Sequence, residues 1–153
     1  MADNVLRRVF VTGGGRGLGS AIVKMLAEAG HDVTFTYRSA KAEADELLKH
    51  LQLGHPEQKF AAHQADLGDK AQVDALAQTI EKEGPYAAFV HNAGQSYDTL
   101  AVMLDQDKAE AAMQVNFWSF TRLAAGLVRD LRKLLGLRRS AVNRALPRSG
   151  KAA

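Results

Sequence analysis

Residues 12–19 read TGGGRGLG, a glycine-rich segment between a short apolar run and an amphipathic stretch. The run before it, VFVT at residues 9–12, is apolar and β-branched, which is typical of a buried parallel strand. After Gly17, apolar residues recur at helical spacing until Gly30. Glycines at such a turn let backbone amides approach a phosphate, and the helix N-terminus adds partial positive charge. The segment therefore predicts a turn that binds a pyrophosphate.

Outward from this turn, strand-like and helix-like segments alternate. The expected strands are 33–37, 60–64 and 86–91, and the expected helices are 17–30, 41–53, 69–83 and one or two within 105–135. Such alternation is the pattern of an α/β fold in which parallel strands form a doubly wound, Rossmann-like sheet.

The composition fits one globular domain. The chain has 153 residues, 46% hydrophobic and 24% charged, and domains typically contain roughly 100–200 residues. The absence of cysteine excludes disulfides, thiolate metal sites and cysteine catalysis, and it fits a cytoplasmic location. We expect no metal site. No apolar run is long enough to cross a membrane, and the start around Arg7 and Arg8 resembles neither a signal peptide nor a twin-arginine leader.

The net charge of +3 is distributed unevenly. Residues 1–130 contain 13 basic and 17 acidic side chains, whereas residues 131–153 contain seven basic and no acidic ones. The body is therefore mildly acidic and shows no basic stripe, so we expect no binding of nucleic acid.

The spacing of the glycines distinguishes between nucleotide-binding motifs. A P-loop requires Lys after its last glycine, but Ser20 follows Gly19. The spacing GxGxxG also fails, because the sixth position counted from Gly13 is Leu18 and counted from Gly15 is Ser20. Neither motif is therefore present.

Two further glycine patterns remain. A GxGxG turn, as in methyltransferases, matches Gly13, Gly15 and Gly17, but the acid expected after the second strand is missing, because residues 37–39 read YRS. The pattern TGxxxGxG fits residues 12–19 fully.

This last pattern resembles the short-chain dehydrogenase/reductase family, and within it 3-oxoacyl-ACP reductases. Three further motifs follow in the family's order: Asp66-Leu67 after the third strand, HNAG at 91–94 after the fourth, and Asn116 at the position of the family's catalytic asparagine. The resemblance covers about residues 5–130. The cofactor-binding residues that this reading predicts are Thr12, Gly13, Gly15, Arg16, Gly17, Leu18, Gly19, Arg38, Asp66, Leu67, Asn92, Ala93 and Gly94.

Charge near the second strand predicts which cofactor is bound. NADP carries a 2′-phosphate where NAD has a hydroxyl that an acid typically holds. Arg38 follows the second strand and Arg16 lies in the glycine segment, and guanidinium groups match phosphate oxygens well. We therefore predict NADP as the cofactor.

The chain also departs from the family pattern. Ala87 replaces the usual Asp and His91 the usual Asn, and we interpret His91 as a packing residue. The family's serine and Tyr-x-x-x-Lys motif, which hold the carbonyl and supply a proton, do not follow Asn116. Asn116 would then position the cofactor and a water without acid–base chemistry, so we expect a catalytically incomplete enzyme.

Residues 1–130 are accordingly predicted to form the NADP-binding part of the fold, and residues 131–153 a basic tail. The tail could extend the last helix and then become disordered, bind an acidic partner, or be out-of-frame sequence after a truncation near residue 130. We favour the third hypothesis because the Arg, Ala, Leu and Ser mixture begins where the resemblance stops.

Three functions remain open. The first is an NADP(H)-dependent reductase of a small-molecule or acyl-carrier-linked ketone, the second a non-catalytic dinucleotide-binding protein, and the third another Rossmann-type enzyme such as a methyltransferase. Because the predicted sheet stops after its fourth strand, we also expect a homo-oligomer or an aggregation-prone chain.

Overall fold

A computed structural model of the chain describes residues 7–145. Its four-stranded sheet has the order β3-β2-β1-β4 and all pairs are parallel. The strands are β1 (Arg8–Thr12), β2 (Asp32–Tyr37), β3 (Phe60–Gln64) and β4 (Ala88–His91). The predicted α/β, Rossmann-like fold is thus confirmed.

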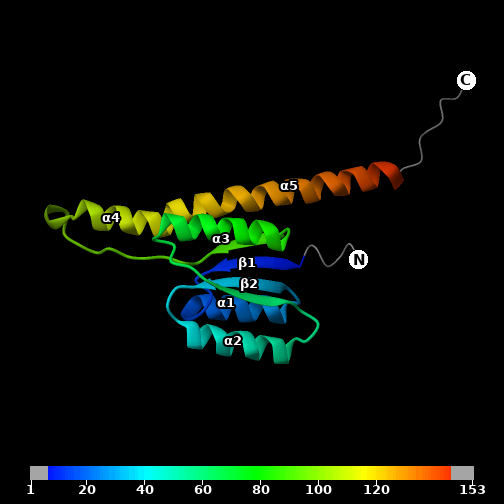
Figure 1. Cartoon of the computed structure of the whole chain (residues 1–153), viewed down its shortest axis with the longest axis horizontal. Coiled ribbons are helices and arrows are strands. Elements are labelled where there is room, and N and C mark those ends of the chain that lie inside the picture. Colours follow the sequence, from blue (N-terminus) through cyan, green and yellow to red (C-terminus); the bar gives the residue numbers. More distant parts are fainter. Residues whose placement is uncertain (1–6, 146–153) are drawn as a thin grey trace, which may run out of the picture.

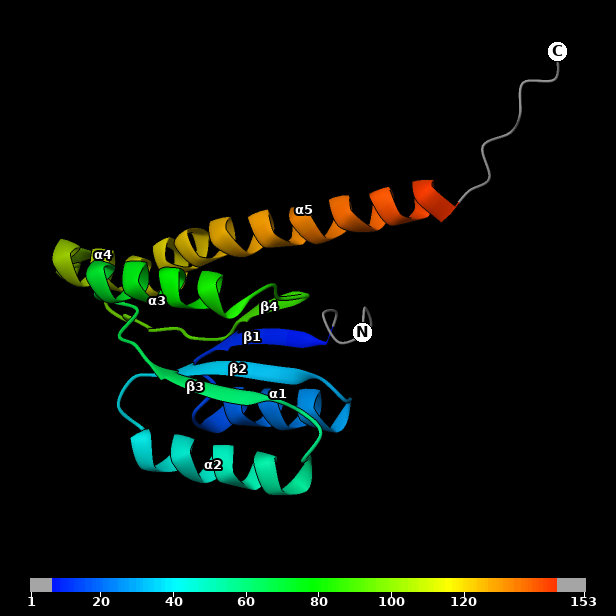
Figure 2. The same ribbon diagram turned by 45° about the vertical axis from the view of Figure 1, so that its right-hand side comes forward.

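Helices cover both faces of the sheet. They are α1 (Gly17–Glu28), α2 (Lys41–Gly54), α3 (Lys70–Glu83), α4 (Gln106–Met113) and α5 (Ser119–Ala145), with a short 3-10 helix η2 (Ala101–Met103) before α4. Figures 1 and 2 show α1 and α2 on one face of the sheet and α3 and α5 on the other.

Alternating side chains of β1 explain this two-sided packing. Val9 and Val11 belong to the apolar core with α1 and α2, whereas Phe10 belongs to the core with α3 and α5. All three are at most 2% exposed. A strand that is apolar on both faces must be covered on both, which is the arrangement of a parallel sheet.

The long C-terminal helical region is interrupted by one π-helical turn. This turn, η3 (Gln114–Trp118), joins α4 to α5, so the expected helices in 105–135 are two. Helix α5 continues past residue 130 to Ala145 without a break at the predicted domain boundary. Residues 146–153 of the predicted tail lie outside the described residues.

Strand β4 begins at Ala88, two residues later than predicted, because its parallel pairing with β1 starts there, opposite Val9. Tyr86, which precedes the strand, is 1% exposed, packs on Phe10, and donates a hydrogen bond to Glu83 Oε2 at 2.9 Å.

No helix within residues 7–145 is long and apolar enough to cross a membrane.

Candidate functional site

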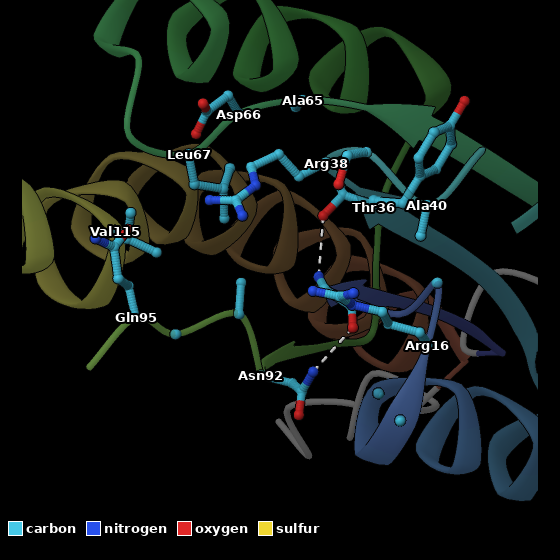
Figure 3. Close-up of a pocket in the computed structure, with 18 of the residues that line it drawn as sticks. Arg16, Thr36, Arg38, Ala40, Ala65, Asp66, Leu67, Asn92, Gln95 and Val115 are labelled. Carbon is cyan, nitrogen blue, oxygen red and sulfur yellow. Dashed lines mark hydrogen bonds between the residues drawn. The ribbon is translucent and has the colours of Figure 1, made fainter. Parts of the chain in front are cut away.

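An open cleft lies at the carboxyl ends of the strands, where open α/β sheets bind ligands. Its volume is about 580 Å³. Figure 3 shows it between the glycine segment, the end of β2 and the loop after β4. Its lining residues are Gly13, Gly15, Arg16, Gly17, Leu18, Gly19, Thr36, Tyr37, Arg38, Ser39, Ala40, Ala65, Asp66, Leu67, Asn92, Ala93, Gly94, Gln95 and Val115.

The glycine segment is held against β2 by two backbone amides. Gly13 N donates to Thr36 Oγ1 at 3.1 Å and Gly14 N donates to Thr36 O at 2.8 Å. Gly13 and Gly17 have positive φ angles of 67° and 55°, which side chains rarely tolerate. Because glycine occupies both positions, the segment adopts this backbone conformation without steric strain.

Helix α1 begins directly at the cleft. Arg16 is its N-cap residue, has an extended backbone, and provides no side-chain hydrogen bond to the helix amides. These first amides carry the positive end of the helix dipole. They are positioned to donate to an anionic group in the cleft.

The turn after β4 is tied to the glycine segment. Asn92 Nδ2 donates to Gly13 O at 3.0 Å (Figure 3) and to Thr12 O at 3.3 Å. Thr12 Oγ1 accepts from the backbone N–H groups of Asn92 and Ala93, both at 3.2 Å. These bonds fix the turn after β4, which forms one wall of the cleft, relative to the glycine segment.

Asn116 anchors the next part of this wall. Its side-chain amide forms two hydrogen bonds with the backbone of Gln95: Nδ2 donates to Gln95 O and Oδ1 accepts from Gln95 N, each at 2.8 Å. Asn116 lies in the π-helical turn and does not line the cleft itself. The side chain thus positions the loop beyond Gly94.

The wall formed by the loop after β3 contains Asp66 and Leu67. Asp66 Oδ1 accepts from Gly68 N at 2.9 Å, while Asp66 lines the cleft. Leu67 is 5% exposed, and its carbonyl accepts from Gln114 Nε2 at 3.4 Å. An apolar surface and a carboxylate therefore lie side by side at this end of the cleft.

Two arginines make the β2 end of the cleft electropositive. Arg16 and Arg38 both line it and both are exposed, whereas Asp66 is the one acidic side chain among the lining residues. In Figure 3 the Arg38 side chain extends from the end of β2 into the cleft. This region is suited to a phosphate.

His91 lies behind the cleft rather than in it. Its ring packs against Phe89 and Phe120, with centroid distances of 5.9 Å and 5.5 Å. Burial lowers the pKa of His91 below its usual 6.5, while the backbone carbonyls of Val115 and Asn116 oppose this shift. The ring therefore favours its neutral form.

Most of the predicted site residues meet in this cleft. All predicted cofactor residues line the cleft except Thr12. The Thr12 hydroxyl instead binds the backbone of the turn after β4, which forms one wall of the cleft. Sequence reasoning missed Thr36, Tyr37, Ser39, Ala40, Ala65, Gln95 and Val115. Several of these directly adjoin predicted residues at strand ends, a signal that could have indicated them. Within residues 7–145 no cluster of three or more His, Asp or Glu side chains could hold a metal ion.

Comparisons with known proteins agree with this geometry. A family model for short chain dehydrogenases matches residues 7–136. The 3-oxoacyl-[acyl-carrier-protein] reductase MabA of Mycobacterium bovis is 32% identical over 130 residues, covering 84% of this chain and 47% of MabA. The chain spans about half the length of the curated relatives it matches.

Two solved structures extend the comparison. A short-chain dehydrogenase from Sphingobium yanoikuyae, in complex with NADPH, matches with a TM-score of 0.72 and 27% identity, over 80% of this chain and 47% of its own. One from Burkholderia cenocepacia, in complex with NADP, matches with a TM-score of 0.72 and 30% identity, over 81% and 50%. The family match over most of the chain, the sheet order and the glycine-lined cleft lead to one conclusion: this chain belongs to the short chain dehydrogenase family.

Proposed function

We propose that the chain binds NADP(H) in this cleft and forms the cofactor-binding part of an oxidoreductase resembling 3-oxoacyl-ACP reductases. The observation that carries the proposal is the juxtaposition of the glycine segment, the free start of α1 and two arginines in one cleft. The NADPH and NADP complexes of the two similar structures support it.

The residues of this chain fit such a dinucleotide. A Cβ on Gly13 would lie 3.0 Å from Ala93 Cα, so glycine keeps the two walls in close approach. A pyrophosphate would accept hydrogen bonds from amides of residues 15–19. Asp66 and Leu67 would hold the adenine, and the Asn92–Gly94 turn would position the nicotinamide side.

Asn116 would act as a positioning residue through Gln95. Bound NADP(H) would supply a hydride for transfer to a ketone. The residues lining the cleft orient the dinucleotide and exclude water from one side of it. The proposed substrate is a 3-oxoacyl thioester or a similar small-molecule or acyl-carrier-linked ketone, as the name of MabA suggests. We propose that the protein acts in the cytoplasm.

A second candidate is a dinucleotide-binding protein without catalysis. It is favoured by the side chains of the cleft, which offer no evident proton donor at the nicotinamide side: the lining residues there are Asn92, Ala93, Gly94 and Gln95. Binding and turnover assays distinguish the two candidates, because only the first requires loss of NADPH absorbance with a ketone.

NADPH is expected to bind at least tenfold more tightly than NADH. The Arg38→Asp variant removes a charge-assisted contact with the 2′-phosphate, worth about 1.5–3 kcal/mol, and adds repulsion. We therefore expect it to weaken NADPH binding about 10- to 100-fold and to leave NADH binding nearly unchanged. Fluorescence titration with both cofactors measures this.

Lys49→Asp is a matched control, because this exposed α2 residue changes the charge equally and does not line the cleft. Equal affinity of the unmodified chain for NADPH and NADH would contradict the assignment.

Self-association is a further expected property. Phe117 and Trp118 are 44% and 55% exposed at the η3 turn, beside Phe120 at 39%. We propose that this aromatic surface packs against a second copy, and we expect light scattering to show a dimer or larger species. The double variant Phe117→Lys/Trp118→Lys should be mainly monomeric, and its melting temperature should not be lower than that of the unmodified chain. A monodisperse monomer of the unmodified chain would refute this proposal.

A further inference from the structure

The hydroxyl group of Thr12 has all of its hydrogen-bonding capacity in use. A threonine hydroxyl has one proton to donate and two lone pairs. Both lone pairs are occupied, because Oγ1 accepts from the backbone N–H groups of Asn92 and Ala93, each at 3.2 Å. Thr12 is fully buried, so water does not replace these partners.

The hydroxyl proton therefore goes to His91. Its Nδ1 lies 3.0 Å from Thr12 Oγ1, and the parallel register of β1 and β4 places the two residues side by side. To accept this proton, Nδ1 must carry a lone pair. The ring is then neutral and has its own proton on Nε2.

The surroundings of His91 favour this state. Its Nε2 is buried and, among residues 7–145, has no partner at hydrogen-bond geometry. The backbone carbonyls of Val115 and Asn116 compensate for burial only in part, so a charged ring would be poorly solvated. Among the residues that the structure describes, the elements packed on the ring present no ionisable side chain to it: Thr12 comes from β1, Phe89 from β4 and Phe120 from α5, and Val115 and Asn116 contribute backbone carbonyls.

We propose that His91 is a positioning residue which, as the neutral Nε2–H tautomer, orients the Thr12 hydroxyl and thereby fixes the Asn92–Gly94 turn against the glycine segment. Its effect on cofactor binding rests on the proposed function, whereas the tautomer itself does not.

Protonation of His91 would disturb this arrangement in a defined way. A proton on Nδ1 would face the hydroxyl proton of Thr12, so the hydroxyl would have to rotate. Rotation points a lone pair at the ring and leaves only one for the two amides of Asn92 and Ala93. The turn would lose one of its ties to β1, and the adjacent cleft wall would loosen.

The tautomer is tested first without cofactor. Nitrogen-15 spectra of the histidine rings near neutral pH, with the His91 signals identified by their absence in His91→Asn, should show an unprotonated Nδ1 and a protonated Nε2. Thr12→Val, which removes the hydroxyl, should change this tautomer ratio, whereas Thr12→Ser should keep it. A protonated Nδ1 in the unmodified chain, or no difference between the two variants, would overturn the proposal.

The consequence for binding is tested with NADP⁺ by calorimetry between pH 7.5 and pH 5. Affinity should fall as the pH passes below 6.5 and through the lowered pKa of His91. His91→Asn retains an acceptor near the Nδ1 position but does not titrate, so its affinity should match the unmodified chain at pH 7.5 and fall less at pH 5. His91→Phe removes the acceptor and should bind about five- to tenfold more weakly at every pH.

All groups other than residue 91 are the same in the unmodified chain and its variants, so their contribution to the pH dependence cancels in the comparison. Identical pH dependence of the unmodified chain and His91→Asn would overturn the positioning role. If no variant binds NADP⁺ while the ring spectra show the expected tautomer, the proposed function fails and the tautomer assignment stands.

Discussion

NADPH oxidation by this chain with a 3-oxoacyl thioester is expected to remain near the uncatalysed background, even when NADPH is bound. A positioned general acid contributes a factor of about 10²–10⁴ to such a reaction. Orientation of the carbonyl contributes a separate factor of comparable size. Within the 153 residues given, no serine and Tyr-x-x-x-Lys motif follow Asn116 at the spacing that the resemblance predicts, so we expect both factors to be missing from reactions of these residues alone.

We expect none of the three tyrosines of the chain to replace this acid. Tyr37 is 9% exposed and packs with the core below α2, at the end of the cleft where the adenosine would lie. Tyr86 is buried, and burial raises the pKa of its hydroxyl. The hydroxyl of Tyr97 accepts from Asp105 N at 3.0 Å at the start of α4, and Tyr97 does not line the cleft.

Loss of NADPH absorbance over time, at saturating NADPH and thioester, measures this prediction. Tyr97→Phe and His91→Ala serve as controls, because Tyr97 follows the Asn92–Gly94 turn in the sequence, His91 precedes it, and both side chains carry a transferable proton. Robust turnover that either substitution abolishes would refute the inactive interpretation and would identify the acid.

Gly19→Ala is expected to abolish cofactor binding and to destabilise the fold. A Cβ at this position would lie 2.0 Å from Gly13 O and 2.6 Å from Asn92 Nδ2. The nearest atom is backbone, so α1 or the glycine segment must move, at a cost of about 3 kcal/mol in the free energy of unfolding. The displacement would also break the hydrogen bond from Asn92 Nδ2 to Gly13 O, which ties the turn after β4 to the glycine segment.

Urea unfolding and NADPH fluorescence titration measure the two effects of this change. We expect affinity to fall at least 100-fold, which corresponds to about 2.7 kcal/mol. Gly54→Ala is the matched control, because Gly54 ends α2 and a Cβ there meets no atom within 4 Å. If Gly19→Ala bound NADPH as tightly as Gly54→Ala, the glycine segment would not be the pyrophosphate site.

The order of strands and helices could be read from the sequence because each element is encoded locally. Strand 60–64 was predicted with the observed bounds. The helix after it was predicted to begin at residue 69, where Asp69 caps α3 by accepting from Ala71 N and Gln72 N. Apolar periodicity and capping residues act over a few positions, so they need no knowledge of the fold. The glycine segment was recognisable for the same reason.

The glycine spacing and the strand-end motifs also indicated the cleft, since the carboxyl ends of parallel strands share one edge of a sheet. The interpretation of His91 as a packing residue captured its burial, but not its bond to Thr12. Sequence reasoning also placed Asn116 at the site without showing that its amide forms two hydrogen bonds with the backbone of Gln95.

The sequence by itself therefore determined the elements, the fold class and the identity of most cleft residues. Only the tertiary structure decided which groups form hydrogen bonds: the Thr36 side chain with Gly13 N, the Asn116 side chain with the Gln95 backbone, and His91 with Thr12. The physical reason is distance along the chain. Thr12 and His91 are 79 residues apart and meet because β1 and β4 align in one particular parallel register. Local periodicity specifies the face on which a side chain lies, whereas the register that brings two such faces together arises from packing of the whole sheet.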